Sequence, residues 1–162
     1  MTLNEAILQK VAEWRPKAGE RQTLSVADQS SGWAASVTAD RNDELGCLAW
    51  ELSLRRPAAP ALSTDGLKAW ADRAAKHVTG LLEPLHVVEV DTQRAEALLR
   101  SERVTQRGHA LHYYEARLKA NHEAVLRRFQ GSHEESKPRQ QVPFALTHEA
   151  LAKVVGDLTA DQ

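Results

Sequence analysis

The fold is decided by residues 33–54, which read WAASVTADRNDELGCLAWELSL. Within 33–39 and 48–54, larger apolar residues alternate with small or polar ones, and a period of two places every second side chain on the same face of a strand. The intervening residues 40–44 are rich in Asp and Asn, which favour tight turns. The stretch therefore predicts two antiparallel strands joined by a hairpin.

Outward from this hairpin, the N-terminal side predicts a helix and a further strand. Thr2 and Glu5 have the spacing of a capping box, and apolar residues then recur at helical steps until residues 15–16, where Arg-Pro ends the run. Leu24 and Val26 continue the period of two. The expected order up to residue 54 is one helix followed by three strands.

Two further helices are predicted after the hairpin. Ser63 or Thr64 caps the first one, whose apolar stripe ends near Gly80. Thr147 caps the second, which closes the chain. Between them, residues 86–91 alternate as a strand, and residues 131–143 are polar and aperiodic, which predicts an exposed loop.

Residues 92–130 fit two structures. Apolar residues from Leu111 to Phe129 have helical spacing, but a hairpin with Asn121 and His122 as a two-residue turn also fits, and we favour it. Residues 95–101 are open between strand and helix. The hairpin register pairs residues on both faces: Leu118 with Val125, Tyr114 with Phe129, and Glu115 with Arg128.

Together these elements predict an α+β fold, an antiparallel sheet of about five to seven strands with helices on one face, in the order α-βββ-α-β(n)-α. This order of elements resembles that of the type III secretion chaperone-like group. The resemblance implies a small cytoplasmic dimer that binds partner proteins and has no catalytic activity. It is carried by the order of elements and by no residue motif.

Length and composition predict a single globular domain over residues 1–162. The chain has a formal net charge of -1 and one cysteine, Cys47, so an intrachain disulfide is excluded and a reducing compartment fits. Its apolar runs are shorter than a signal peptide or membrane span requires. We expect a cytoplasmic protein that is not embedded in a membrane.

Histidine, acidic and cysteine residues that could bind metal or catalyse a reaction are better explained by structural roles. His109 and His112 with His122, His133 or His148 suggest a metal site, but on a strand the first two point to opposite faces. Asp40, Asp43 and Glu44 lack EF-hand spacing and suit a solvated turn. Cys47 has no local base or cation to form a thiolate. The sequence predicts no catalytic residue, no cofactor and no metal ligand.

Residues 91–139 hold ten basic and seven acidic side chains, a modest positive excess close to Tyr113, Tyr114 and Phe129. Arginines beside exposed aromatics are typical of single-strand nucleic-acid surfaces. The predicted register buries Tyr114 against Phe129 and pairs Arg128 with Glu115, which leaves few groups for such a surface. Nucleic acid is therefore the third hypothesis.

The leading hypothesis is a non-enzymatic module, chaperone- or adaptor-like, that binds another protein or a second copy of itself as a homodimer. Its expected interaction face is the apolar side of the third strand, formed by Leu48, Trp50, Leu52 and Leu54. The alternative is an enzyme or small-ligand binder with a pocket between sheet and helices. That pocket would use His112, Tyr114 or Glu115 among its polar groups.

Overall fold

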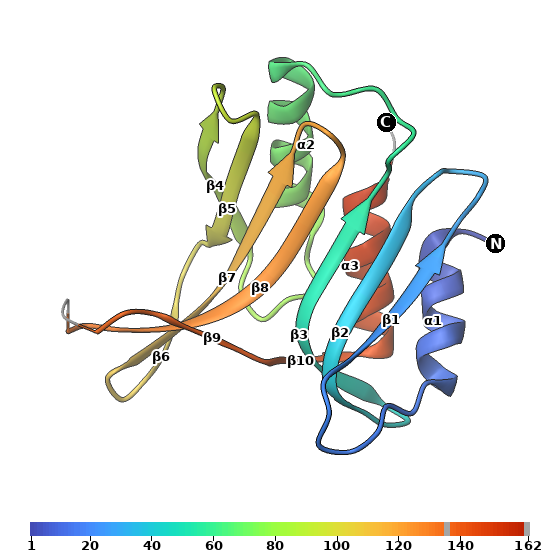
Figure 1. Ribbon diagram of the computed structural model, residues 1–162. Coiled ribbons are helices and arrows are strands. Elements are labelled where there is room, and N and C mark those ends of the chain that lie inside the picture. Colours follow the sequence, from blue (N-terminus) through green and yellow to red (C-terminus); the bar gives the residue numbers. More distant parts are fainter. Residues whose placement is uncertain (135–136, 161–162) are drawn as a thin grey trace.

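The structure is a computed structural model, and it describes residues 1–134 and 137–160. Over these residues, three helices lie on one face of an antiparallel sheet (Figure 1), which confirms the predicted α+β class and the helices on one face. The helices are α1 (Leu3–Glu13), α2 (Thr64–His77) and α3 (His148–Thr159).

Seven strands form the main path of the sheet, in the order β1-β2-β3-β8-β7-β5-β4. In chain order their bounds are β1 (Gln22–Ala27), β2 (Ala34–Asn42), β3 (Gly46–Arg55), β4 (Leu85–Asp91), β5 (Glu96–Ser101), β7 (Ala110–Lys119) and β8 (Glu123–Ser132). Consecutive strands are mostly neighbours, as short connections require.

Three further strands bring the sheet to ten within the described residues, above the five to seven that we expected. They are β6 (Thr105–Arg107), β9 (Gln140–Val142) and β10 (Phe144–Thr147), which pair with β7, β8 and β3 respectively. Each is only three or four residues long, too short to show a period of two in the sequence.

The helix caps are where the sequence predicts them. Thr2 and Glu5 form the capping box of α1, the Ser63 hydroxyl accepts from the Gly66 amide at the start of α2, and Thr147 caps α3. Helix α2 ends at His77, three residues before Gly80. The indole N–H of Trp70 on α2 donates to the Leu158 carbonyl at 2.9 Å, which fixes α2 against α3.

Strand β3 changes its inward-facing phase halfway along. Its register against β2 passes from Glu51 opposite Thr38 to Ala49 opposite Ala39, so Trp50 is the extra residue of a bulge. Cys47 and Ala49 face the helices before the bulge, and after it the residues at 52 and 54 do so. The bulge therefore turns Trp50 to the uncovered face of the sheet.

Residues 92–130 form strands joined by turns, and the predicted hairpin is correct in kind but wrong in register. The turn takes three residues, 120–122, and His122 adopts φ 62°. Lys119 therefore pairs with Glu123 next to the turn, whereas a two-residue turn would have paired Ala120 with Glu123. This one-residue difference exchanges partners across the hairpin: Tyr113 pairs with Phe129, Tyr114 with Arg128, and Glu115 with Arg127. It also moves Arg128 to the helix-covered face.

The C-terminal part of the predicted loop 131–143 is ordered by the sheet. Strands β3 and β8 pair only over 52–55 and 123–126 and then separate, and β9 and β10 fill the gap, β9 against β8 and β10 against β3. The Gln141 side chain donates to the Trp50 carbonyl at 2.9 Å across this gap. Strand β8 itself continues to Ser132. Residues 135–136 of the predicted loop lie outside the described residues.

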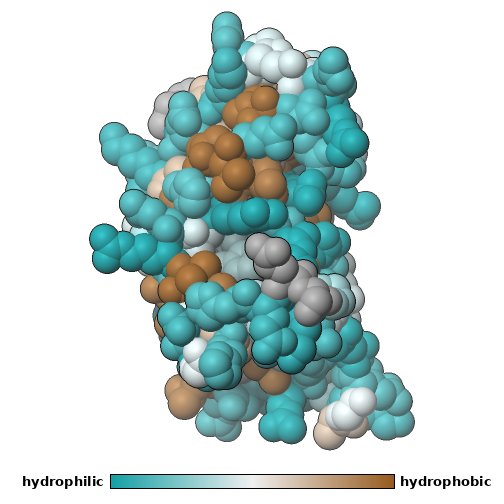
Figure 2. Space-filling model, turned by 90° about the vertical axis from the view of Figure 1, so that its left-hand side faces the viewer, coloured by the Kyte–Doolittle hydropathy of each residue, from teal (hydrophilic) through white to brown (hydrophobic). Residues whose placement is uncertain are grey.

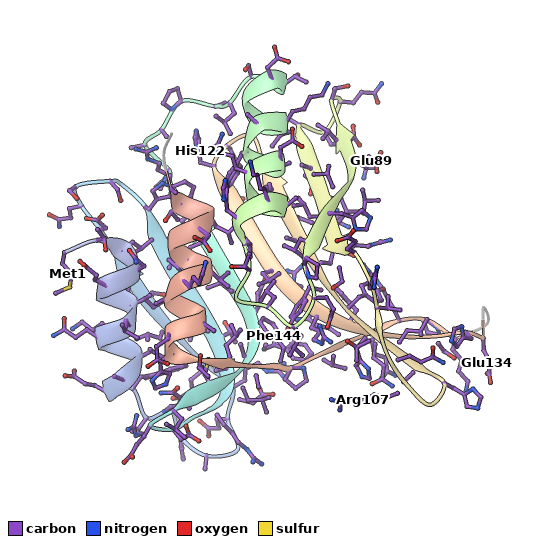
Figure 3. The ribbon with its side chains drawn as sticks, turned by 180° about the vertical axis from the view of Figure 1, so that it is seen from behind. Met1, Glu89, Arg107, His122, Glu134 and Phe144 are labelled. Carbon is purple, nitrogen blue, oxygen red and sulfur yellow. The ribbon has the colours of Figure 1, made fainter. Side chains whose placement is uncertain are left out.

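An arm extends beyond the helix layer. It consists of β6, β9 and the adjoining ends of β7 and β8 (Figure 1), and Figure 3 shows Arg107 and Glu134 at its far end. Among the described residues, none of the helices has the length and apolar character needed to cross a membrane.

Candidate functional site

The candidate site is the face of the sheet opposite the helices, here called the open face. Figures 1 and 3 show the sheet from its two sides, with all three helices on one of them. Along β2 and β3 the inward residues are buried, whereas their neighbours on the open face are partly exposed. The open face differs in chemistry between its two halves.

Over β1 and β2 the open face carries hydroxyl pairs. Thr23 bonds to Thr38, and Ser25 bonds to Ser36, each at 2.8 Å between the oxygens. Nearby, Arg21 donates to Asp40 at 2.7 Å and lies 3.6 Å above the ring of Trp50. The hydrogen bonds of these side chains are made to one another, so this half of the open face has no excess of either charge.

Over β5, β7 and β8 the open face carries what we call the arginine cluster: Arg100, Arg117, Arg127 and Arg139 around Glu115. Cross-strand pairing places Arg100 and Arg127 on either side of Glu115, and Arg117 follows it by two residues on β7. Arg139 comes directly before β9, and it reaches the cluster because β9 pairs with β8. Arginines from β5, from β7 itself and from the residue before β9 thus converge on one carboxylate.

The Glu115 carboxylate is held by three guanidinium groups. Arg100 Nε lies 3.2 Å and Arg117 Nε 3.3 Å from its oxygens, and Arg139 donates to both oxygens. Burial by itself would raise the pKa of Glu115, but the hydrogen bonds and charges of Arg139 and Arg100 outweigh it and hold that pKa below its usual range. Glu115 is therefore ionised at neutral pH.

Two aromatic rings are built into the same cluster. Tyr113 and Phe129 stack with their centroids 6.0 Å apart. Arg139 lies 3.9 Å above the Phe129 ring, and Arg100 lies 5.9 Å from the ring of Tyr113. These contacts fix the guanidinium planes, since arginine stacks favourably on aromatic faces.

A second arginine–glutamate cluster lies on the opposite face, beneath the loop after α2. Arg128 donates to both oxygens of Glu83 at 3.0 and 3.1 Å, and hydroxyls of Ser101 and Thr105 donate to the same carboxylate. Burial would raise the pKa of Glu83, but these donors together lower it. Both partners are buried, so this pair anchors the loop to the sheet.

The structure separates the four residues of the predicted interaction face. Leu52 and Leu54 are buried beneath the helices, at 1% and 2% exposure. Leu48 and Trp50 are partly exposed on the other face, because the bulge at Trp50 shifts the phase of β3. The four side chains therefore do not form one surface.

Two of the three predicted pocket residues, Tyr114 and Glu115, are also separated. Glu115 faces the open face, while Tyr114 is buried on the helix side, where its hydroxyl accepts from the Leu82 amide and its ring meets Phe144 edge-on. Tyr114 and Glu115 are consecutive on a strand, so they point in opposite directions.

The histidines and the cysteine have local surroundings of their own. His148 bonds through Nε2 to the Asn42 side chain at 2.8 Å. The described residues contain no group of three His, Cys, Asp or Glu side chains able to hold a metal ion. Burial raises the pKa of the Cys47 thiol to about 11, so it stays protonated at neutral pH.

The edge strand β4 offers a different kind of surface. Figure 2 shows the side of the molecule that includes this edge as mainly hydrophilic, with separate hydrophobic patches. Val88 on β4 and Val104 between β5 and β6 are about half exposed, at 44% and 48%. A bulge between Val87 and Glu89 interrupts the β4 ladder, and such bulges discourage pairing with another strand.

Sequence reasoning missed the arginine cluster for two physical reasons. The one-residue register difference paired Glu115 with Arg128 instead of Arg127, and Arg139 fell in a segment expected to be a loop. The available signal was the alternation at Glu115 and Arg117, which puts both side chains on one face of a strand. No family model, no curated protein and no solved structure matches this chain.

Proposed function

We propose that this protein is a non-enzymatic protein-binding module, chaperone- or adaptor-like, whose partner docks on the open face of the sheet. The observation that carries the proposal is the arginine cluster with its stacked Tyr113 and Phe129. Arginine and aromatic side chains are enriched in protein interfaces and dominate their binding energy. Trp50, with Arg21 above its ring, adds the same residue types further along this face.

The ionisable groups of the molecule support a binding role more than a catalytic one. Glu83 and Glu115 have lowered pKa values and are held by arginines, whereas a general acid or base works best with a pKa near neutrality. The thiol of Cys47 is buried and has a raised pKa, the opposite of an activated nucleophile. A buried thiol also suits the cytoplasm, which we include in the proposal.

Site-specific photocross-linking in cell extract tests the proposal. A photoreactive residue replaces Ser53 on the open face in one variant and exposed Lys68 on α2 in a matched control. We expect a discrete protein adduct from position 53 and not from position 68. An adduct of twice the chain mass would identify a second copy as the partner. Equal labelling from both positions would contradict the proposed docking face.

A further inference from the structure

The arginine cluster presents cations to the outside and keeps its anions underneath. The side chains of its four arginines are between 37% and 41% exposed. Glu115 is 3% exposed, and the two other carboxylates that pair with the cluster, Glu96 and Glu51, are 20% and 28% exposed. A partner approaching the open face therefore meets guanidinium groups first.

The donors of the cluster exceed what its central carboxylate can accept. Each guanidinium carries five N–H donors, whereas a carboxylate has about four acceptor sites. Arg100, Arg117 and Arg139 share Glu115, and the raised pKa of Arg139, caused first by its hydrogen bonds to Glu115, keeps that group charged under all ordinary conditions. The cluster is preorganised by its own buried carboxylate and can accept a second one.

The chemistry favours carboxylates on a polypeptide over a nucleic acid. Base stacking needs open ring faces, but Arg139 covers Phe129 and the Tyr113 ring stacks on Phe129. Glu51 and Glu96 are interleaved with the arginines, and a continuous phosphate backbone would meet them at close range. Separate carboxylates can bind bidentately to the arginines and avoid both.

We infer that the arginine cluster receives a carboxylate-rich, extended segment of a partner protein. This inference rests on the proposed docking face and specifies its occupant. The segment would run over β7 and β8, with acidic side chains toward Arg100, Arg117 and Arg127.

Fluorescence anisotropy with a labelled oligo-glutamate peptide tests the inference on the full chain. The test variant is Arg100→Gln with Arg127→Gln, which removes two exposed cations and leaves Arg117 and Arg139 on Glu115. The control is Arg73→Gln with Lys68→Gln on α2, which removes the same charge from the opposite side of the molecule. Circular dichroism and urea unfolding verify that each variant folds.

We expect the wild-type protein to bind the peptide at low salt, with an affinity that falls as salt is added. The double arginine variant should bind about ten-fold more weakly, because each of the two exposed charges that it removes contributes part of the binding free energy. The α2 control should bind as the wild type does. Equal weakening of both variants would overturn the inference, since it would show attraction to overall charge.

Two other outcomes would also overturn it. The first is absence of wild-type binding at low salt, and the second is tighter binding of a labelled oligo-uridylate strand than of oligo-glutamate. Either result leaves the proposed function to be judged separately by cross-linking. An adduct from position 53 combined with no peptide binding would mean that a partner docks on the open face through other chemistry.

Discussion

Arg127 and Arg128 are neighbours on β8 and both pair with a glutamate, yet their side chains lie on opposite faces of the sheet and differ in burial. Arg128 and Glu83 are about 6% and 7% exposed and close on each other through two hydrogen bonds. Arg127 pairs with Glu51 at 2.8 Å but is 37% exposed. A buried pair whose hydrogen bonds are all made anchors the fold, whereas a cluster with surplus exposed donors is available to a partner.

Replacement of each arginine by methionine gives the largest contrast. Arg128→Met leaves the Glu83 carboxylate buried without its cation and should lower the free energy of unfolding by about 3–5 kcal/mol. Arg127→Met breaks a solvent-exposed pair and should lower it by less than about 1 kcal/mol. Urea unfolding measures both. Similar losses in the two variants would show that the faces are not as different as their burial indicates.

Substitution of the central carboxylate separates stability from binding. Glu115→Gln removes the negative charge and one of the two acceptor oxygens that three arginines share, and these arginines can turn to water, so we expect a loss of about 1–2 kcal/mol, less than for Arg128→Met. The same variant exposes more unpaired positive charge, so oligo-glutamate should bind more tightly. Weaker peptide binding would indicate that Glu115 matters chiefly because it orients the arginines.

Acid should weaken the fold through the same two carboxylates. Both Glu83 and Glu115 have folded-state pKa values below the ordinary 4.5, so their contribution to stability is present above that value and is lost as the pH falls through it toward the folded-state pKa. The free energy of unfolding, measured in urea across a pH series, should therefore decline below about pH 5. The decline should be shallower in Glu83→Gln with Glu115→Gln, and an unchanged slope would contradict the assignment.

The hydroxyl half of the open face should respond least. Ser36→Ala removes one exposed hydrogen bond to Ser25 and should change the free energy of unfolding by less than about 0.5 kcal/mol. Oligo-glutamate affinity should not change, because the arginine cluster lies over other strands. A large loss of affinity in this variant would extend the binding surface to β1 and β2.

The sequence predicts the scaffold better than the candidate site, and particular residues show why. Local signals decide the caps at Thr2, Ser63 and Thr147, so these are correct. The site depends on register: three turn residues instead of two at 120–122 exchange Arg127 for Arg128 as the partner of Glu115. The bulge at Trp50 likewise changes which residues of β3 share a face. No local sequence pattern reveals this bulge.

Arg139 shows a second limit of local reasoning. Its neighbours are polar and aperiodic, and β9 becomes a strand only because β3 and β8 separate and leave pairing positions open. That separation is a tertiary property of the twisted sheet. A residue that completes the cluster was therefore beyond the reach of periodicity.

The most direct test of the open face as the binding surface is an NMR titration of the ¹⁵N-labelled protein with oligo-glutamate peptide. We expect the Nε–H signals of Arg100, Arg117 and Arg127 to shift first, together with amides of β7 and β8. Signals from α2 and from the buried Arg128 should stay in place. Shifts concentrated on α2 and α3, or spread evenly over the molecule, would contradict the account.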